Sequence, residues 1–294
     1  MLPLNNRITV LFIMKKLLIF VLAFSFLLAS SLTLTSCDAN RTLKILTYNV
    51  IGCVDYSGYG LEGWNPWTAP SSVDKVAKIV KDSKAQVIGF NEIYGRGYDE
   101  NDKQVERIAE KVGYNYQYFA KASLGISAYP IGNGMVSKFE IIESETTLVP
   151  ATTLSEIPEG DLKDSEDRSL LRAVIDFNGT AVSVYVTHLG LDSKAKSRMI
   201  NTILEKIEGE TNPYIVMGDF NLEPNEELLT PLFNKMQSTA KVMNNTHKTW
   251  STYGGEARID YIFVSNHFTV KKYKVIDVNV SDHYPCYAEV VLNN

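Results

Sequence analysis

The chain has 294 residues, of which 29 are Lys or Arg, 34 are Asp or Glu, and 45% are hydrophobic. That length lies within the range of one α/β domain, and no repeat or low-complexity linker divides it. The acidic balance argues against a protein that grips long nucleic acids, because such proteins gather Lys and Arg along a groove and no Lys/Arg-rich stretch occurs here.

Residues 1–36 have the pattern of a targeting segment, which we expect to lie outside the folded domain. Two lysines follow an internal Met14, which is a second candidate start, and residues 17–36 carry no charge. The run ends in Leu34-Thr35-Ser36-Cys37, which resembles a bacterial lipobox. We therefore expect residues 1–36 to be a lipoprotein signal peptide with Cys37 lipidated, and residues 37–42 to be a short tether. A retained membrane-spanning helix is the alternative, since about 20 apolar residues can cross a bilayer, although the Ser and Thr residues near its end favour processing.

Loss of the signal peptide removes three bases and no acid, which leaves 26 bases against 34 acids and a net charge of about −8. This charge favours a small phosphorylated or membrane-borne substrate over a long polyanion. We expect a monomer in the cell envelope, anchored by lipid and facing either the periplasm or the outside. Because the tether is so short, the domain is expected to sit close to the bilayer.

Apolar periodicity predicts the elements in chain order. The first are a strand at 43–51, a helix around 73–80, a strand at 85–93 and a helix at 101–112. From 114 to 186 strand follows strand, with turns at Gly132-Asn133-Gly134 and at Asn178-Gly179, the second a strong hairpin pattern. The last are a helix around 200–207, a strand at 214–217, a helix at 226–235, and strands at 259–264, 269–276 and 284–292. Helices at both ends of a strand-rich centre predict two face-to-face sheets with helices outside, in one domain over residues 43–294.

Four short segments place polar residues at the ends of buried strands, where burial without a partner is costly. They are Thr47-Tyr48-Asn49, Phe90-Asn91-Glu92, Gly218-Asp219-Phe220-Asn221 and Ser281-Asp282-His283. Any one alone fits a helix cap or an ion pair better than a site. Four in one chain favour a common site.

These segments, with His188 and Arg258-Ile259-Asp260-Tyr261-Ile262, occur in an order that resembles the endonuclease/exonuclease/phosphatase superfamily. The resemblance spans nearly the whole mature chain. It implies a DNase I-like fold, which is a four-layer α/β/β/α sandwich of two mainly antiparallel sheets with the active site at one end. It also implies a phosphoesterase that depends on Mg²⁺ or Mn²⁺.

The resemblance assigns the metal ligands. Glu92 is expected to be the main ligand, with Asn49 and Asp282 beside it. Hydrolysis of a phosphate ester calls for a hard cation on the phosphate oxygens, and Mg²⁺ takes oxygen ligands and keeps several waters, so that few protein ligands are needed.

The resemblance also assigns the catalytic residues. Asp219 would orient or deprotonate the attacking water, and Asn221 would fix the geometry of the neighbouring Asp219 and touch phosphate. His188 and His283 would donate hydrogen bonds to phosphate oxygens as charge develops on them. Asp260 would orient the ring of His283 and favour its protonated form.

Two features depart from the family pattern or add to it. Asn91 stands where family members often have Gln, so the hydrogen bond made there is expected to differ. The loop after the first strand is rich in aromatic residues, namely Tyr56, Tyr59, Trp64 and Trp67. They form a recognition pocket, touch lipid, or pack on their own domain. Arg168 and Arg198 are predicted to form structural ion pairs.

Cys53 and Cys286 remain once Cys37 is lipidated. In the family the first and last strands are neighbours, so these two residues are expected near Asn49 and His283. The pair has two alternative states, two thiols or a disulfide that braces the site. The sequence does not choose between them, since a bridge needs Cα atoms within about 7 Å.

The leading functional hypothesis is a metal-dependent phosphoesterase acting on a small or lipid-linked phosphodiester or phosphomonoester. An extracellular endonuclease or exonuclease acting on DNA or RNA is the nearest alternative. A lipoprotein binding module that has lost turnover is the third, and the complete set of polar residues argues against it. The fold does not choose among substrates.

Overall fold

The computed structural model describes residues 40–65, 68–95, 103–124, 130–161 and 166–294. The predicted signal peptide, the predicted lipidation site Cys37 and the aromatic residue Trp67 lie outside these ranges. Residues 43–294 form one compact unit. Within the described ranges, no helix has the length and apolar character needed to cross a membrane.

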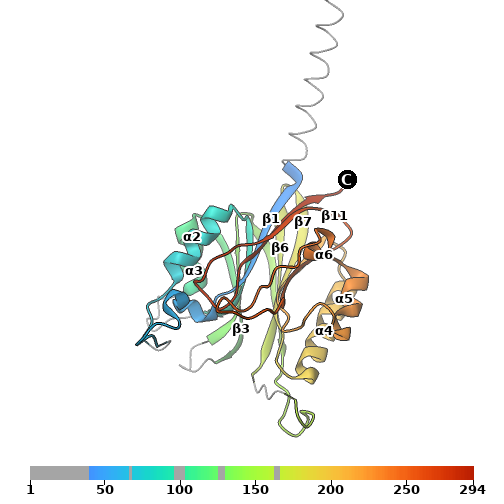
Figure 1. Ribbon diagram of the computed structural model, residues 1–294. Helices are drawn as coiled ribbons and strands as arrows, with labels where there is room; N and C mark the ends of the chain where they lie inside the picture. Colours follow the sequence, from blue (N-terminus) through green and yellow to red (C-terminus); the bar gives the residue numbers. More distant parts are fainter. Residues whose placement is uncertain (1–39, 66–67, 96–102, 125–129, 162–165) are drawn as a thin grey trace, which may run out of the picture. The chain divides into compact units, whose positions relative to one another are not determined.

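Two six-stranded sheets make up the centre of this unit (Figure 1). The first sheet has the order β11-β12-β1-β2-β4-β3 and the second the order β5-β6-β7-β8-β10-β9. The first comprises β1 (Thr42–Asn49), β2 (Val87–Tyr94), β3 (Tyr116–Leu124), β4 (Pro130–Ser137), β11 (Phe268–Val275) and β12 (Cys286–Leu292). The second comprises β5 (Ile141–Val149), β6 (Arg168–Phe177), β7 (Thr180–His188), β8 (Tyr214–Asp219), β9 (Gln237–Ser238) and β10 (Asp260–Val264). Parallel pairing joins β1 to β2 and β7 to β8, whereas the hairpin-linked pairs are antiparallel.

Helices cover the outer faces of the two sheets. They are α2 (Val73–Ser83), α3 (Gln104–Val112), α4 (Ser193–Glu208), α5 (Thr230–Lys235) and α6 (Thr239–Val242), with 3₁₀ turns η1 (Ile51–Cys53), η2 (Tyr56–Gly58) and η3 (Glu227–Leu229). Buried residues of α2 and α3 pack with β1 and β2, and those of α4 and α5 pack with β7, β8 and β10. The predicted four-layer sandwich is thus confirmed.

Strand β1 shows how one strand contributes side chains to two hydrophobic cores. Side chains alternate across a strand, so Leu43 and Ile45 enter the core between the sheets while Leu46 and Tyr48 enter the core under α2 and α3. All four are fully buried. Because both faces of β1 are covered, apolar residues occur at odd and at even positions of the strand, interrupted by Lys44 and Thr47.

The predicted turn at Gly132-Asn133-Gly134 is wrong, because these residues lie inside β4. The glycines serve close packing there. A Cβ on Gly132 would lie 2.1 Å from the carbonyl oxygen of Ala120, and one on Gly134 would lie 2.7 Å from Val105 Cγ2. The predicted hairpin at Asn178-Gly179 is confirmed, since both residues have positive φ, 54° and 88°, between β6 and β7.

Candidate active site

The polar strand ends predicted from the sequence converge at one end of the sandwich. Asn49 ends β1 and pairs in register with Asn91 of β2. In the second sheet, Asp219 ends β8 and lies in register with His188 of β7 on one side and with Asp260 of β10 on the other. Pairing between neighbouring strands therefore brings these distant positions to one sheet end.

Asn49 joins the two sheets at this point. Its amide nitrogen Nδ2 donates to Glu92 Oε1 at 2.9 Å and to Asp219 Oδ2 at 3.2 Å. Ser281 Oγ donates to the backbone oxygen of Asn49 at 2.8 Å, which holds the segment before β12 against β1. The two carboxylates that matter most to the hypothesis thus lie close together.

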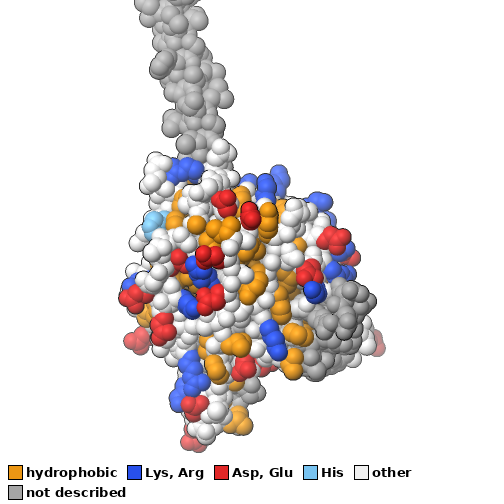
Figure 2. Space-filling model, turned by 180° about the vertical axis from the view of Figure 1, so that it is seen from behind, with side chains coloured by type: hydrophobic (Ala, Val, Ile, Leu, Met, Phe, Trp, Pro, Cys, Tyr) orange, Lys and Arg blue, Asp and Glu red, His pale blue; other side chains and the backbone are white. Residues whose placement is uncertain are grey.

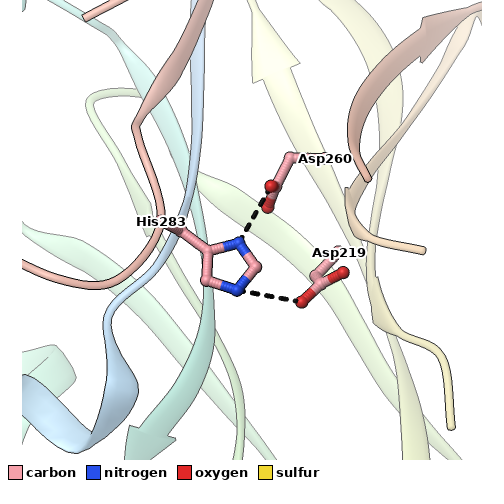
Figure 3. A group of neighbouring side chains, drawn as sticks. All are labelled: Asp219, Asp260 and His283. Carbon is pink, nitrogen blue, oxygen red and sulfur yellow. Dashed lines mark hydrogen bonds and ion pairs between the residues drawn. The ribbon is translucent and has the colours of Figure 1, made fainter. Parts of the chain in front are cut away.

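His283 lies between two buried carboxylates (Figure 3). Its Nδ1 is 2.9 Å from Asp260 Oδ2 and its Nε2 is 3.5 Å from Asp219 Oδ2. Each of these three residues offers one atom that could bind a metal, and these atoms all lie within 4.8 Å of one another, which is compatible with a metal site. However, both ring nitrogens already face carboxylate oxygens, an arrangement that suits a protonated imidazole better than a metal ligand.

His188 also approaches Oδ2 of Asp219, with Nε2 at 3.5 Å. Asn221 Nδ2 lies 3.2 Å from this Nε2 and also donates to the Leu189 carbonyl oxygen. On the opposite ring nitrogen, Arg168 NH1 lies 3.3 Å from Nδ1. Arg168 and Asn221 thus place hydrogen-bond donors against the two ring nitrogens, while the Asp219 carboxylate also faces Nε2. Arg168 also pairs with Glu166, but its contact with His188 was not anticipated.

The backbone around the site is held in unusual conformations. Glu92 has φ 52° beside a register shift in the pairing of β2 with β4, and Asn221 has φ 50°. Gly218 has φ 142°, and a Cβ there would lie 1.8 Å from the Thr187 carbonyl oxygen. Such conformations are costly for side-chain-bearing residues and cluster at functional sites. The Gly218-Asp219 pair thus lets β8 approach β7 closely at the point where Asp219 enters the site.

Asn91 does more than the sequence suggested. Its Nδ2 donates to Asn133 Oδ1 and to the Thr187 carbonyl oxygen, both at 2.7 Å, and its Oδ1 accepts from Asp219 N at 3.0 Å. Asn133 in turn donates to the carbonyl oxygen of Ser169 at 2.7 Å. This buried chain of hydrogen bonds fixes the two sheets directly behind the site.

Comparison with known proteins accords with this geometry. The sequence profile described as the Endonuclease/Exonuclease/phosphatase family matches residues 46–283. The chain belongs to this family. Comparison with functionally curated proteins gave no match.

Solved structures of the endonuclease/exonuclease/phosphatase fold resemble the chain over most of its length. An endonuclease/exonuclease/phosphatase from Beutenbergia cavernae is 20% identical with a TM-score of 0.68, over 86% of this chain and 72% of that one. A Bacteroides thetaiotaomicron mannosyl-6-phosphatase is 19% identical with a TM-score of 0.65, over 85% and 100%. D. rerio TDP2, complexed with a single-strand DNA product, is 16% identical with a TM-score of 0.61, over 85% and 98%. At these identities the likeness shows the fold.

Burial and neighbouring charge shift the ionisation of this family member's site residues. Burial, and then the charge of Asp282, raise the pKa of Glu92. Burial, then the charges of Arg168 and His283, hold the pKa of His188 well below its usual value. Burial alone would lower the pKa of His283 too, but Asp260 and Asp219 outweigh it and raise that pKa to about 10. At neutral pH one histidine is therefore neutral and the other is a cation.

The donor set fits a hard divalent cation. Glu92 keeps a third of its side-chain surface exposed, and the charge of Asp282 acts on it although they come from different segments. A cation between them would stabilise the charged form of Glu92, which burial otherwise penalises. Asn49 is placed differently, since its amide oxygen accepts from Ile51 N at 3.1 Å while its nitrogen faces the carboxylates. A ligand role for Asn49 stays a prediction.

The two remaining cysteines lie in the described part of the chain. The order of the first sheet puts β12 beside β1, as expected. Cys53 and Cys286 are both buried and are not bonded to each other. Of the two alternatives that the sequence left open, the structure has the two thiols.

Proposed function

We propose that the chain is a divalent-metal-dependent phosphoesterase that hydrolyses a small phosphate ester. The observation that supports this most strongly is the convergence of Glu92, Asp219, His188 and His283 on one point. Shared hydrogen bonding by Asn49 holds the two carboxylates there. Ester hydrolysis needs a proton acceptor for the attacking water and hydrogen-bond donors to the phosphate. The Asp219 carboxylate can serve as the acceptor, and the two imidazoles that face it can serve as the donors.

Glu92 and Asp282 would hold the cation, Mg²⁺ or Mn²⁺. When bound, it would neutralise charge on the phosphate oxygens and so lower the repulsion of the attacking oxygen. Glu92 is suited to this because it is both partly exposed and anchored by Asn49. The exposed edge of its carboxylate remains available to a ligand.

Asp219 would orient the attacking water and take up its proton. Its Oδ1 is held by the backbone nitrogen of Asn221 at 2.9 Å, which leaves Oδ2 as the oxygen that faces the site. Protonated His283 would donate through Nε2 to a phosphate oxygen, while Asp260 holds the opposite ring nitrogen. Neutral His188 has one ring N–H, which would donate a hydrogen bond to a phosphate oxygen.

The substrate is proposed to be small because of the charge distribution. On the face seen in Figure 2, Lys and Arg side chains alternate with Asp and Glu, and the described residues there form no continuous basic stripe. Long nucleic acids are bound through such stripes. The fold neighbours include both a sugar phosphatase and a protein bound to a DNA product, so a nuclease remains the second candidate function.

The proposed anchor bears on the choice of substrate. Leu43, the first residue of the folded unit, lies at the end of β1 opposite to Asn49. At about 3.3 Å per residue, roughly 20 Å of strand separate Leu43 from Asn49. A small ester free in solution and a phosphate ester of a lipid in the anchoring bilayer are both candidate substrates. We propose an envelope location with Cys37 as the lipidated residue.

A panel of phosphate esters assayed with and without Mg²⁺ and Mn²⁺ tests the function. We expect metal-dependent release from small esters, abolished in Asp219→Asn. Plasmid nicking without activity on small esters would favour the nuclease. No hydrolysis of any activated diester with either metal would leave the binding module as the explanation.

A further inference from the structure

An aromatic cluster stands beside the proposed active site. The rings of Tyr59 and Tyr253 stack with centroids 4.0 Å apart and planes 25° apart. Tyr56 stacks against both at 5.8 and 5.7 Å, with planes within 24°. Trp64 packs edge-on against Tyr56 and Tyr59 at 4.8 and 5.1 Å. Three tyrosine rings from two distant segments thus share nearly one plane orientation.

Two members of the cluster keep large parts of their surface open to solvent. Tyr59 is 49% exposed and Tyr253 is 39% exposed. We call these two residues the aromatic platform. Tyr56 and Trp64 are more covered and support it from behind, and the Trp64 indole is fixed by its hydrogen bond to the Asp55 carbonyl oxygen at 3.2 Å. The platform is therefore ordered before any ligand arrives, which reduces the entropy cost of binding.

The platform is continuous with the proposed metal site. The loop that carries Tyr253 is tied to Asp282, because Thr252 N donates to the Asp282 carbonyl oxygen at 2.9 Å. From the same loop, Trp250 Nε1 donates to the Asp282 carboxylate at 3.3 Å and its ring is 39% exposed. On the other side, Tyr56 N donates to the Val280 carbonyl oxygen, two residues before Asp282.

Electrostatics agree with this proximity. Burial, then the charges of Asp282 and Glu92, raise the pKa of Tyr56. Burial and Asp282 likewise raise the pKa of Tyr253. The tyrosine rings thus lie within the field of the carboxylates expected to hold the cation.

Packing on the domain accounts for Tyr56 and Trp64, but not for the exposed faces of Tyr59 and Tyr253. Exposed aromatic surface next to a polar site is a feature of ligand-binding sites. The near-parallel arrangement favours a flat ring as the next member of the stack, because flat rings gain most from offset stacking. The net charge of the chain disfavours a long polynucleotide.

We propose that the aromatic platform, Tyr59 and Tyr253, binds a flat heteroaromatic ring in the organic group of the substrate, such as the base of a mononucleotide, while its phosphate lies at the cation site that Glu92 and Asp282 would form. This assignment rests on the proposed phosphoesterase function and adds the class of substrate. Trp250 also borders the site, since its ring is partly exposed to solvent and its indole nitrogen donates to Asp282.

The test compares phosphate esters that differ only in the organic group, namely a nucleoside, a pyranose and glycerol, each as the monoester and the methyl diester. kcat/KM is measured for the full chain and for Tyr59→Leu, Tyr253→Leu and the matched ring-preserving variants Tyr59→Phe and Tyr253→Phe. Loss of one stacking partner is worth about tenfold in affinity per base. We expect each Leu variant to lose about that factor for the nucleoside ester alone, with KM rising more than kcat falls, and the Phe variants to retain activity.

Equal losses on all three esters, no loss on the nucleoside ester, or a loss confined to the pyranose ester would overturn the assignment. If no ester is hydrolysed, the proposed function fails, but binding still tests the platform. Quenching of intrinsic fluorescence by adenosine 5′-monophosphate should then saturate in the wild-type chain and weaken in Tyr253→Leu but not in Tyr253→Phe. Equal quenching in all three proteins would overturn the proposal.

Discussion

Glu92 and Asp219 accept hydrogen bonds from one nitrogen, Nδ2 of Asn49, although they belong to different sheets. The site therefore depends on how the two sheets are held against each other at this end. Burial keeps that contact rigid, since protein cores are close-packed and resist sliding. Residues that lock the sheets together behind the site are accordingly part of the active-site design.

Asn91 is the first such residue. Asn91→Ala would leave three buried polar groups without their present partner, namely Asn133 Oδ1, the Thr187 carbonyl oxygen and Asp219 N. Each group left unsatisfied costs about 1–3 kcal/mol. We expect the free energy of unfolding in urea to fall by about 3 kcal/mol. The exposed control Asn266→Ala should change it by less than about 0.5 kcal/mol, and equal values for the two variants would contradict the role of Asn91.

A substitution at Gly132 tests whether this residue lies inside β4 in close contact with the neighbouring strand. In Gly132→Ala the added methyl would meet the Ala120 carbonyl oxygen of the neighbouring strand. Overpacking of this kind costs about 1–3 kcal/mol. Gly209 is the matched control, because a Cβ there meets nothing within 4 Å and its φ is −85°. Thermal unfolding should separate the two variants clearly, and an unchanged Tm in Gly132→Ala would argue against the close approach.

Periodicity and turn chemistry predicted most of the fold. Buried strands such as β1 and β2 and amphipathic helices such as α4 carry a local pattern that survives folding. The turn predicted at Gly132-Asn133-Gly134 was wrong because glycine is common both in turns and where two strands approach closely. Only the neighbouring strand in the folded protein distinguishes these two roles. The two-residue strand β9 and the short helix α6 were also missed, since so few residues carry no periodicity.

The site was predicted in part. Strand-end carboxylates and histidines have an order along the chain that the family resemblance could use. The role of Asn91 and the contact between Arg168 and His188 have no local pattern, because each depends on register between strands that are distant in sequence. A buried Asn directly before the expected metal ligand was the one available sign. The sequence shows the aromatic residues of the loop after β1, but Tyr253 joins them only in three dimensions.

Asp260 is expected to act through His283. In Asp260→Asn the carboxylate charge that raises the pKa of His283 is lost while burial, which lowers it, remains. The pKa of His283 should therefore fall from about 10, as followed by NMR titration of the metal-free protein. Activity should fall about a hundredfold, the order typical of losing an acid or base. The exposed control Asp277→Asn should change neither quantity, and lost activity with an unchanged His283 pKa would contradict the assignment.

Glu210 should make stability depend on pH at a place remote from the site. Burial disfavours its charge, but hydrogen bonds from Ser183, Tyr185 and Arg172 outweigh burial and lower its pKa. A carboxylate with a lowered folded-state pKa contributes stability above its unfolded pKa, near 4.3, and loses it as pH falls through the folded value. Glu210→Gln should therefore destabilise the protein by about 1.5 kcal/mol at pH 7.

The gap between wild type and Glu210→Gln should close as the pH of urea unfolding is lowered from 5 to 3. Glu143, which pairs with the same Arg172 at 3.1 Å but is 66% exposed, provides the control. Exposed ion pairs contribute little, so Glu143→Gln should cost less than about 0.5 kcal/mol. A gap for Glu210→Gln that is the same at every pH would show that its charge is not the cause.

Calorimetric titration of Mn²⁺ into the purified chain, with Glu92→Gln and the control Glu289→Gln, tests the central claim most directly. The substitution keeps the shape of the side chain but removes the anionic oxygen that a hard cation requires. We predict saturable binding to the wild type and to Glu289→Gln, and an affinity at least about tenfold weaker in Glu92→Gln. Undiminished Mn²⁺ affinity in Glu92→Gln would contradict the account.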